Sequence, residues 1–489
     1  MIGRFLNVML VPLYTRVFLQ EEYGIITQVY AYIAFLNILF TYGLETAFFR
    51  FFQTEKEKRR VFSTSVLSIL GSSIVFALVI ILFSQPIAGF VFQADAVGAM
   101  DHSQFAYYIK IFAGILALDA IAAIPFARLR QENKAKRFAL IRLTGIAVNI
   151  GLNVFFLIVC PMISKNGVPG WLGIVYDPTM GIGYVLLSNL FASGMTLLLL
   201  LPQFQSAGSG FDSQLWKRMV FYAFPLMIAG FAGMINETFD RILIPYLIAD
   251  KSSSMAQLGI YGACYKLSIA MTLFIQTFRY AAEPFFFSQS TKENPQKIYA
   301  NVMHMFVLAC TLIFLIVMLY IDVFKYFIGP DFRSGLKIVP VLLLANLFLG
   351  VYYNLSIWYK LAASTRWGAW ISIGGALVTL LFNFLLIPVW GYMGAAWATL
   401  ICYAAMMAAS YFIGQKFYPV PYNVKSFFFY LVLTVAVWGM SELFASILGL
   451  KGILLMLFNT VLLLVFVLIA WSRERGKNGY LRHSSENPK

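Results

Sequence analysis

Apolar runs long enough to cross a membrane recur from one end of this 489-residue chain to the other. A helix needs about 20 mainly apolar residues to span a hydrocarbon core roughly 30 Å thick. In lipid every backbone polar group must be paired within the protein, which leaves only helices and closed barrels. The runs are continuous rather than alternating, and only 12% of the residues are charged, too few to cover a soluble surface. The sequence therefore predicts an all-α integral membrane protein.

The apolar runs predict about fourteen transmembrane helices. Their approximate ranges are 1–19, 24–49, 61–92, 105–127, 138–160, 182–202, 218–248, 258–287, 299–328, 337–361, 368–388, 391–415, 426–447 and 452–471. The first run is short and is interrupted by Arg4 and Arg16. We expect that the natural start lies upstream and that part of this helix is missing. The alternative is a helix that is short because it lines a water-filled cavity.

Positive charge is distributed unevenly over the loops. The net charge is +15, and 24 of the 36 Lys and Arg residues lie in or beside the segments after spans 2, 4, 6, 8, 10 and 12 and in the C-terminal tail. Lys and Arg concentrate in the cytoplasmic loops of membrane proteins. We therefore predict that both termini face the cytoplasm. The basic charge is explained by this topology, and we expect no nucleic acid partner.

Three pairs of short motifs indicate an internal duplication. The matching segments are 149–153 with 383–388, 181–183 with 391–394, and 22–24 with 258–261. Six spans per copy is an even number, so the copies would share one orientation and be related by a pseudo-two-fold axis along the membrane normal. We predict an N-terminal lobe at 1–205, a C-terminal lobe at 206–418, two accessory spans at 419–472 and a basic cytoplasmic tail at 473–489.

Charged residues inside the predicted spans are the best guide to function, because a charge at the bilayer centre costs at least about 2.5 kcal/mol. They gather in spans 1, 2, 7 and 8, so we expect a two-lobed cavity with a basic lining. The cationic candidates for binding a ligand are Arg4, Arg16, Arg50, Lys266 and Arg279. The carboxylates that are candidates for coupling to protons or sodium ions are Glu45, Glu237 and Asp240.

These candidates also have structural interpretations. Arg279 and Glu283 are spaced i, i+4 on one helix and could neutralise each other. Asp240 and Arg241 lie near a membrane boundary, where a solvated pair explains them equally well. Salt bridges to nearby cations could also explain the candidate carboxylates. Lys266 is the strongest candidate, because no acidic residue lies three or four positions away. We expect it to face water or an anionic ligand.

Other chemistries find no support in the sequence. The four cysteines lie within or at the ends of apolar runs, and the three histidines are far apart, so we predict no metal or redox centre. We find no glycine-rich nucleotide motif and no Ser/His/Asp grouping. We therefore expect neither a cofactor nor an enzymatic activity.

Five stretches carry a resemblance to a known family. They are 12–16 with 21–24, 43–50, the pair Asp240-Arg241, and 383–388 running into 391–399, which is the most specific. The sequence is similar in these stretches to the polysaccharide biosynthesis flippases of the multidrug/oligosaccharidyl-lipid/polysaccharide exporter superfamily. The resemblance covers essentially the whole chain. The sequence departs from the family at its N-terminus, because the first helix of the family usually starts earlier.

The resemblance implies a protein that moves undecaprenyl-diphosphate-linked oligosaccharide from the cytoplasmic to the periplasmic leaflet of the bacterial inner membrane, for O-antigen, capsule or exopolysaccharide. It implies alternating access driven by an ion gradient or the membrane potential. The bound molecules would be the lipid-linked oligosaccharide and membrane lipid, and candidate partners are the polysaccharide polymerase and the chain-length machinery. A diphosphate cannot cross hydrocarbon unaided. Lys266, Arg279, Arg50 and Arg4 would supply the cationic cavity that it needs.

Two other functions compete with this one. A multidrug or peptidoglycan-precursor exporter would use the same fold, although a drug exporter for cations should have a cavity rich in carboxylates. A membrane polysaccharide polymerase or ligase belongs to a different class and should carry a large exterior loop with catalytic residues. The longest exterior loop here, 161–181, offers only Lys165 and Asp177.

Overall fold

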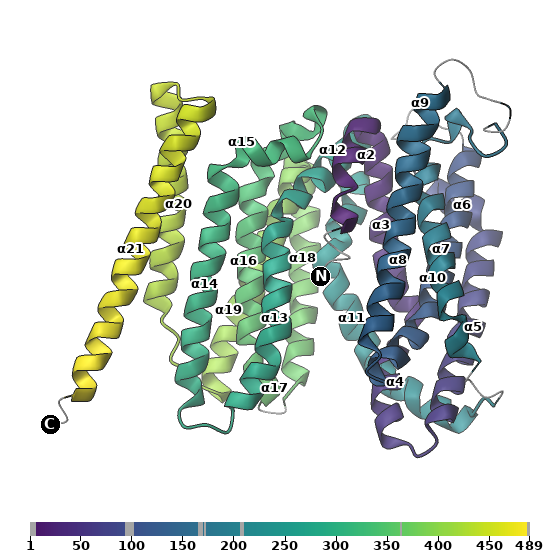
Figure 1. Ribbon diagram of the computed structural model, residues 1–489, viewed down its shortest axis with the longest axis horizontal. Coiled ribbons are helices and arrows are strands. Elements are labelled where there is room, and N and C mark those ends of the chain that lie inside the picture. The colour runs from purple at the N-terminus through teal and green to yellow at the C-terminus, as the bar shows by residue number, and fades with distance from the viewer. Residues whose placement is uncertain are drawn as a thin grey trace. The chain divides into compact units, whose positions relative to one another are not determined.

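The computed structural model describes residues 6–92, 102–164, 170, 173–205, 210–361 and 364–486, and these residues form helices and no strands. The α-helices (Figure 1) are α2 (Val11–Val17), α3 (Gln20–Thr41), α4 (Leu44–Thr54), α5 (Lys58–Leu82), α6 (Ser84–Val91), α7 (His102–Gln131), α8 (Ala135–Val154), α9 (Cys160–Ser164), α10 (Gly183–Phe204), α11 (Ser213–Leu247), α12 (Lys251–Tyr265), α13 (Ile269–Gln289), α14 (Pro295–Leu319), α15 (Ile321–Phe324), α16 (Val339–Leu355), α17 (Ile357–Leu361), α18 (Arg366–Trp390), α19 (Tyr392–Phe417), α20 (Val424–Leu448) and α21 (Gly452–Glu486).

Thirteen helices in the described part of the chain are long and apolar enough to cross a membrane. They correspond in order to predicted spans 2 to 14, which confirms the all-α membrane class. The first predicted span is represented by the seven-residue helix α2. Several spans combine two helices, since α3 continues into α4 and α12 into α13.

Two of these spans are interrupted beside candidate site residues. Between α3 and α4 the backbone of Tyr42 and Gly43 has positive φ angles of 34° and 71°. A Cβ atom on Gly43 would lie 2.9 Å from the carbonyl oxygen of Ala223, so a close approach to α11 also requires glycine here. Between α12 and α13 the chain makes a 3-10 turn over Lys266–Ser268. Each interruption lies close to a predicted functional charge, Glu45 or Lys266.

The chain divides into two compact units. The first contains Met1–Ala263 and Ser372–Thr399, and the second contains Cys264–Ile371 and Leu400–Lys489. These units record which helices pack together, and they do not coincide with the lobes predicted at 1–205 and 206–418. The predicted lobes come from the sequence duplication that we expect, and a contact with the signature of such a duplication occurs within the first unit.

That signature is a reciprocal contact between α3 and α12. A Cβ atom on Gly24 would lie 2.1 Å from the carbonyl oxygen of Met255, and one on Gly259 would lie 2.0 Å from that of Gln20. Gly24 and Gly259 are 235 residues apart, and so are Gln20 and Met255, which matches the offset of the repeated motifs. Equivalent positions therefore contact each other symmetrically, as they do beside a two-fold axis.

The other repeated motifs also have matching local structure. Asn153 and Asn383 are fully buried on α8 and α18. Each donates a side-chain hydrogen bond to the carbonyl oxygen four residues earlier, at 2.8 Å to Asn149 and 2.7 Å to Thr379. These bonds give both asparagines a structural role within their helices. They support the predicted duplication without assigning the motif to a ligand.

Candidate functional site: a charged cleft between α13, α16 and α17

One predicted cation, Arg279, lies in a cleft of the second unit. The cleft is formed by α13, α16 and α17 and has an empty volume of about 330 Å³. Its charged residues are Arg279 and Glu283 from α13 and Lys360 from α17. The Arg279 side chain is exposed, and its guanidinium carbon lies 4.6 Å from the centre of the Tyr353 ring. This cation–π contact holds the guanidinium over α16.

Close helix packing brings the walls of the cleft together. Gly350 on α16 faces the ring of Phe306, and a Cβ atom at this position would lie 2.5 Å from that ring. The same Cβ atom would lie 3.0 Å from Ile275 on α13. Phe306 in turn packs against Phe278, with ring centres 4.5 Å apart. The absence of a side chain at Gly350 thus lets α13 and α14 lie close to α16.

The carboxylate in the cleft has a partner from a distant part of the chain. Glu283 accepts a hydrogen bond from Lys360, with 2.7 Å between Lys360 Nζ and Glu283 Oε1. The structural interpretation from sequence paired Glu283 with Arg279, but the ion pair that forms is with Lys360. Sequence reasoning missed Lys360, because its position at the end of a span marked it only as one of the cytoplasmic positive charges.

Asn354 adds an unused hydrogen-bond donor to this cleft. Its side chain is 4% exposed, and its Nδ2 atom is among the buried polar atoms of the described residues that have no hydrogen-bond partner. Asn354 lines the cleft together with the charged residues. A buried amide without a partner costs about 1–3 kcal/mol, so a ligand oxygen that accepted from it would be favoured.

Lys266 lies on the 3-10 turn that separates α12 from α13. Lys266 is partly buried, while Leu267 and Ser268 beside it are buried. The neighbouring Cys264 donates through Sγ to the carbonyl oxygen of Phe332 at 3.3 Å, which anchors the end of α12. Lys266 and Arg279 therefore lie on one interrupted span, the first at its break and the second on the helix that follows.

The candidates on α4 lie in the first unit. The exposed Arg50 places its guanidinium carbon 4.3 Å from the ring centre of Tyr222 on α11. Glu45 forms an ion pair with Arg130 of α7. Both residues of this pair are more than one-third exposed, at 37% for Glu45 and 44% for Arg130. The salt-bridge alternative for Glu45 is thus realised in the structure.

The candidates on α11 have contrasting environments. Asp240 is 4% exposed, and both its oxygens accept hydrogen bonds, Oδ2 from the Tyr261 hydroxyl and Oδ1 from the backbone N–H of Arg241 at 2.8 Å. Glu237 is exposed. The two carboxylates are three positions apart but do not share one environment.

The candidates in the first predicted span have limited structural support. Arg16 is exposed on α2, and its Nη1 atom donates to the carbonyl oxygen of Pro12 at 2.8 Å. Arg4 lies outside the described residues. No group of three or more potential metal ligands occurs in the described part of the chain.

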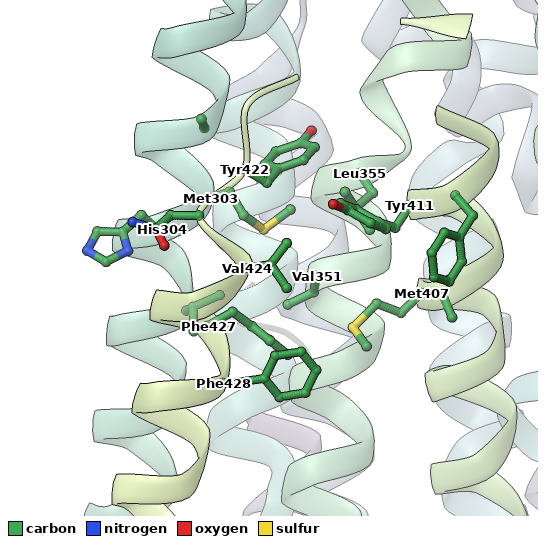
Figure 2. A pocket seen from close by; sticks show the side chains of 15 residues that line it. Met303, His304, Val351, Leu355, Met407, Tyr411, Tyr422, Val424, Phe427 and Phe428 are labelled. Carbon is green, nitrogen blue, oxygen red and sulfur yellow. The ribbon is translucent and has the colours of Figure 1, made fainter. Parts of the chain in front are cut away.

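A second, larger pocket in the same unit is apolar. It has an empty volume of about 810 Å³ and is lined mainly by Met, Val, Leu and aromatic side chains of α14, α16, α19 and α20. Figure 2 shows the ring of His304 turned away from the side chains that surround the pocket. The His304 Nε2 atom lies 2.8 Å from Glu474 Oε1, although its orientation is not that of a hydrogen bond. The pocket surface is therefore hydrocarbon-like and suits an apolar chain.

The family assignment follows from comparison with known proteins. A family model described as polysaccharide biosynthesis protein matches residues 1–290. The chain belongs to this family. No curated protein sequence gives a significant match.

Solved structures of transporters share the fold. The lipid II flippase MurJ in an inward closed conformation has a TM-score of 0.68 at 14% identity, covering 96% of this chain and 97% of that one. An inward-facing multidrug resistance MATE family transporter of the MOP superfamily has a TM-score of 0.65 at 12% identity, covering 85% and 93%. At these identities the likeness establishes the fold, a multi-pass membrane architecture used by flippases and transporters.

Proposed function

We propose that this family member is a flippase for polyprenyl-diphosphate-linked oligosaccharide, which it moves from the cytoplasmic to the periplasmic leaflet for surface polysaccharide synthesis. The observation that carries the proposal is the cleft in which Arg279 and Lys360 place two cations beside one carboxylate. Such a site favours a multivalent anion, and arginine in particular binds phosphate oxygens in pairs. The match to a family described as polysaccharide biosynthesis protein supports a cargo that contains sugars.

The position of the cleft along its spans is consistent with binding of the lipid-linked oligosaccharide from the cytoplasmic side. Lys360 and Glu283 lie near the ends of spans 10 and 8, which the distribution of Lys and Arg assigns to the cytoplasmic side. Lys266, Arg50, Arg16 and Arg4 are proposed to extend the cationic surface. The apolar pocket of the same unit would receive part of the polyprenyl chain, because its lining matches hydrocarbon.

Energy for this cycle is proposed to come from an ion gradient or the membrane potential, with Glu45, Glu237 and Asp240 as coupling candidates. Glu237 is the most accessible of the three, since Glu45 is held by Arg130 and Asp240 by Tyr261. The proposed location is the bacterial inner membrane with both termini cytoplasmic. The polymerase and the chain-length machinery are proposed as partners, since they consume the flipped product.

A peptidoglycan-precursor exporter is the second candidate, because the similar lipid II flippase structure spans almost the whole chain. Its cargo would also carry a diphosphate, so the cleft alone does not separate the two functions. The effect of deleting the gene distinguishes them. The proposal predicts viable cells that lose surface polysaccharide and accumulate one lipid-linked oligosaccharide in the cytoplasmic leaflet. Accumulation of lipid II with loss of viability would support the second candidate instead.

We expect Arg279→Ala to reduce surface polysaccharide at least tenfold when it replaces the wild-type gene, since it removes a charge-assisted contact to the diphosphate. Lys297→Ala is the matched control and should export normally, because Lys297 is exposed near the start of α14 and does not line the cleft. Polysaccharide is measured on the cell surface, and protein level by blotting of membranes. Normal export in the Arg279 variant would refute the role of this cleft.

A further inference from the structure

The ion pair between Lys360 and Glu283 lies within the charged cleft. Lys360 donates to Glu283 at 2.7 Å, and both side chains are partly accessible, at 24% for Lys360 and 40% for Glu283. An ion pair with this much exposure contributes little net free energy, so another anion can replace the carboxylate at small cost. Glu283 therefore holds the Lys360 side chain in position, but another anion can take the place of Glu283 as its partner.

Arg279 and Asn354 add two hydrogen-bond donor groups beside this pair. Arg279 faces Tyr353, and the buried Nδ2 atom of Asn354 has no acceptor among the described residues. With Lys360, these groups make two cations and one buried amide donor, against a single carboxylate among the residues that line the cleft. A ligand with several anionic oxygens would satisfy all three donors, whereas Glu283 satisfies only one.

We propose that Glu283 is an internal counter-ion, whose carboxylate occupies the place of a phosphate oxygen on Lys360 until a diphosphate ester displaces it. This inference rests on the proposed function and adds a role for a residue that has the same sign of charge as the ligand. Glu283 keeps Lys360 oriented in the empty cleft and lowers the affinity for the diphosphate. A flippase gains from this competition, because the cargo must be released after it has crossed.

The test measures binding of farnesyl diphosphate and of inorganic pyrophosphate to the full-length protein in phosphatidylcholine nanodiscs. Glu283→Gln should bind farnesyl diphosphate about two- to fivefold more tightly than the wild type, the range that a partly exposed ion pair allows. Lys360→Gln should bind it about tenfold more weakly. In the double variant the gain from Glu283→Gln should disappear, because Glu283 acts through Lys360.

Matched controls remove one charge on the same side of the protein without touching the cleft. Glu293→Gln and Lys297→Gln, both exposed, should change the affinity by less than the paired substitutions. Thermal unfolding of each variant in nanodiscs confirms that it is folded. A gain from Glu283→Gln that persists without Lys360, or that Glu293→Gln reproduces, would overturn the inference by showing a general electrostatic effect.

The outcomes separate this inference from the proposed function. If the wild type binds farnesyl diphosphate and Glu283→Gln binds no more tightly, the counter-ion role is wrong and the flippase proposal stands. If the wild type binds neither probe, both fail. A gain confined to inorganic pyrophosphate would point to a free anion and would contradict the lipid-linked source.

Discussion

Asp240 illustrates how a charged residue inside a span can be satisfied by its surroundings. Its two oxygens accept hydrogen bonds from Tyr261 and from the backbone of Arg241, and little of the side chain is exposed. Buried carboxylates are tolerated in membranes when such partners are present. The contacts therefore account for Asp240 structurally, while Glu237 is exposed.

At this scale Lys266 provides a direct prediction. We expect Lys266→Ala to abolish surface polysaccharide while the protein level in the membrane stays normal, because the substitution removes a cation from the break between α12 and α13. Surface polysaccharide and membrane-bound protein are measured together. Lys451→Ala, in the exposed turn before α21, is the control and should export normally. Full export by the Lys266 variant would remove this residue from the proposed cationic surface.

Part of the cleft could be predicted from sequence and part could not. The sequence predicts Arg279 as a candidate, because a charge within an apolar run is conspicuous. It does not single out Lys360, since this residue ends its span and resembles a topology signal. The ion pair between Glu283 and Lys360 joins residues far apart in the chain. The choice between Arg279 and Lys360 as the partner of Glu283 depends on how α17 packs.

At the scale of elements, α3 and α12 cross in close contact. Gly24 and Gly259 each leave no room for a Cβ atom against the backbone of the opposite helix. The hydrophobic effect does not drive helices together in lipid, so close packing through small residues contributes to their association instead. Under the predicted duplication, this crossing would join equivalent helices of the two repeats.

We therefore expect Gly259→Ala to push α12 away from α3 and to destabilise the protein by about 1–3 kcal/mol, the usual cost of overpacking. Thermal unfolding of the purified protein in detergent measures this effect. Gly151→Ala on α8 is the matched control, because nothing lies within 4 Å of a Cβ atom there. Equal melting temperatures for the two variants would show that the crossing is more open than described.

At the scale of the whole molecule, the prediction concerns topology. All four cysteines are buried, so single cysteines introduced in loops can be labelled against a low background. A membrane-impermeant maleimide added to whole cells should label Ile174→Cys, which lies in the exposed loop before α10. Ser290→Cys, after α13, should react only once the cells are permeabilised. The reverse pattern would place the termini outside and would contradict loading of the cleft from the cytoplasm.

The class of the protein, the order of its spans and most of the span boundaries can be predicted from the amino-acid sequence. Those properties depend on apolar runs and on where charges interrupt them, and both are local in the chain. Three contacts follow only from the packing of the helices: Glu283 with Lys360, Glu45 with Arg130, and Gly24 with Gly259. Each of these contacts joins helices distant in sequence. Side-chain partners in a membrane bundle are set by which helix faces pack together, and similar apolar runs do not specify those faces.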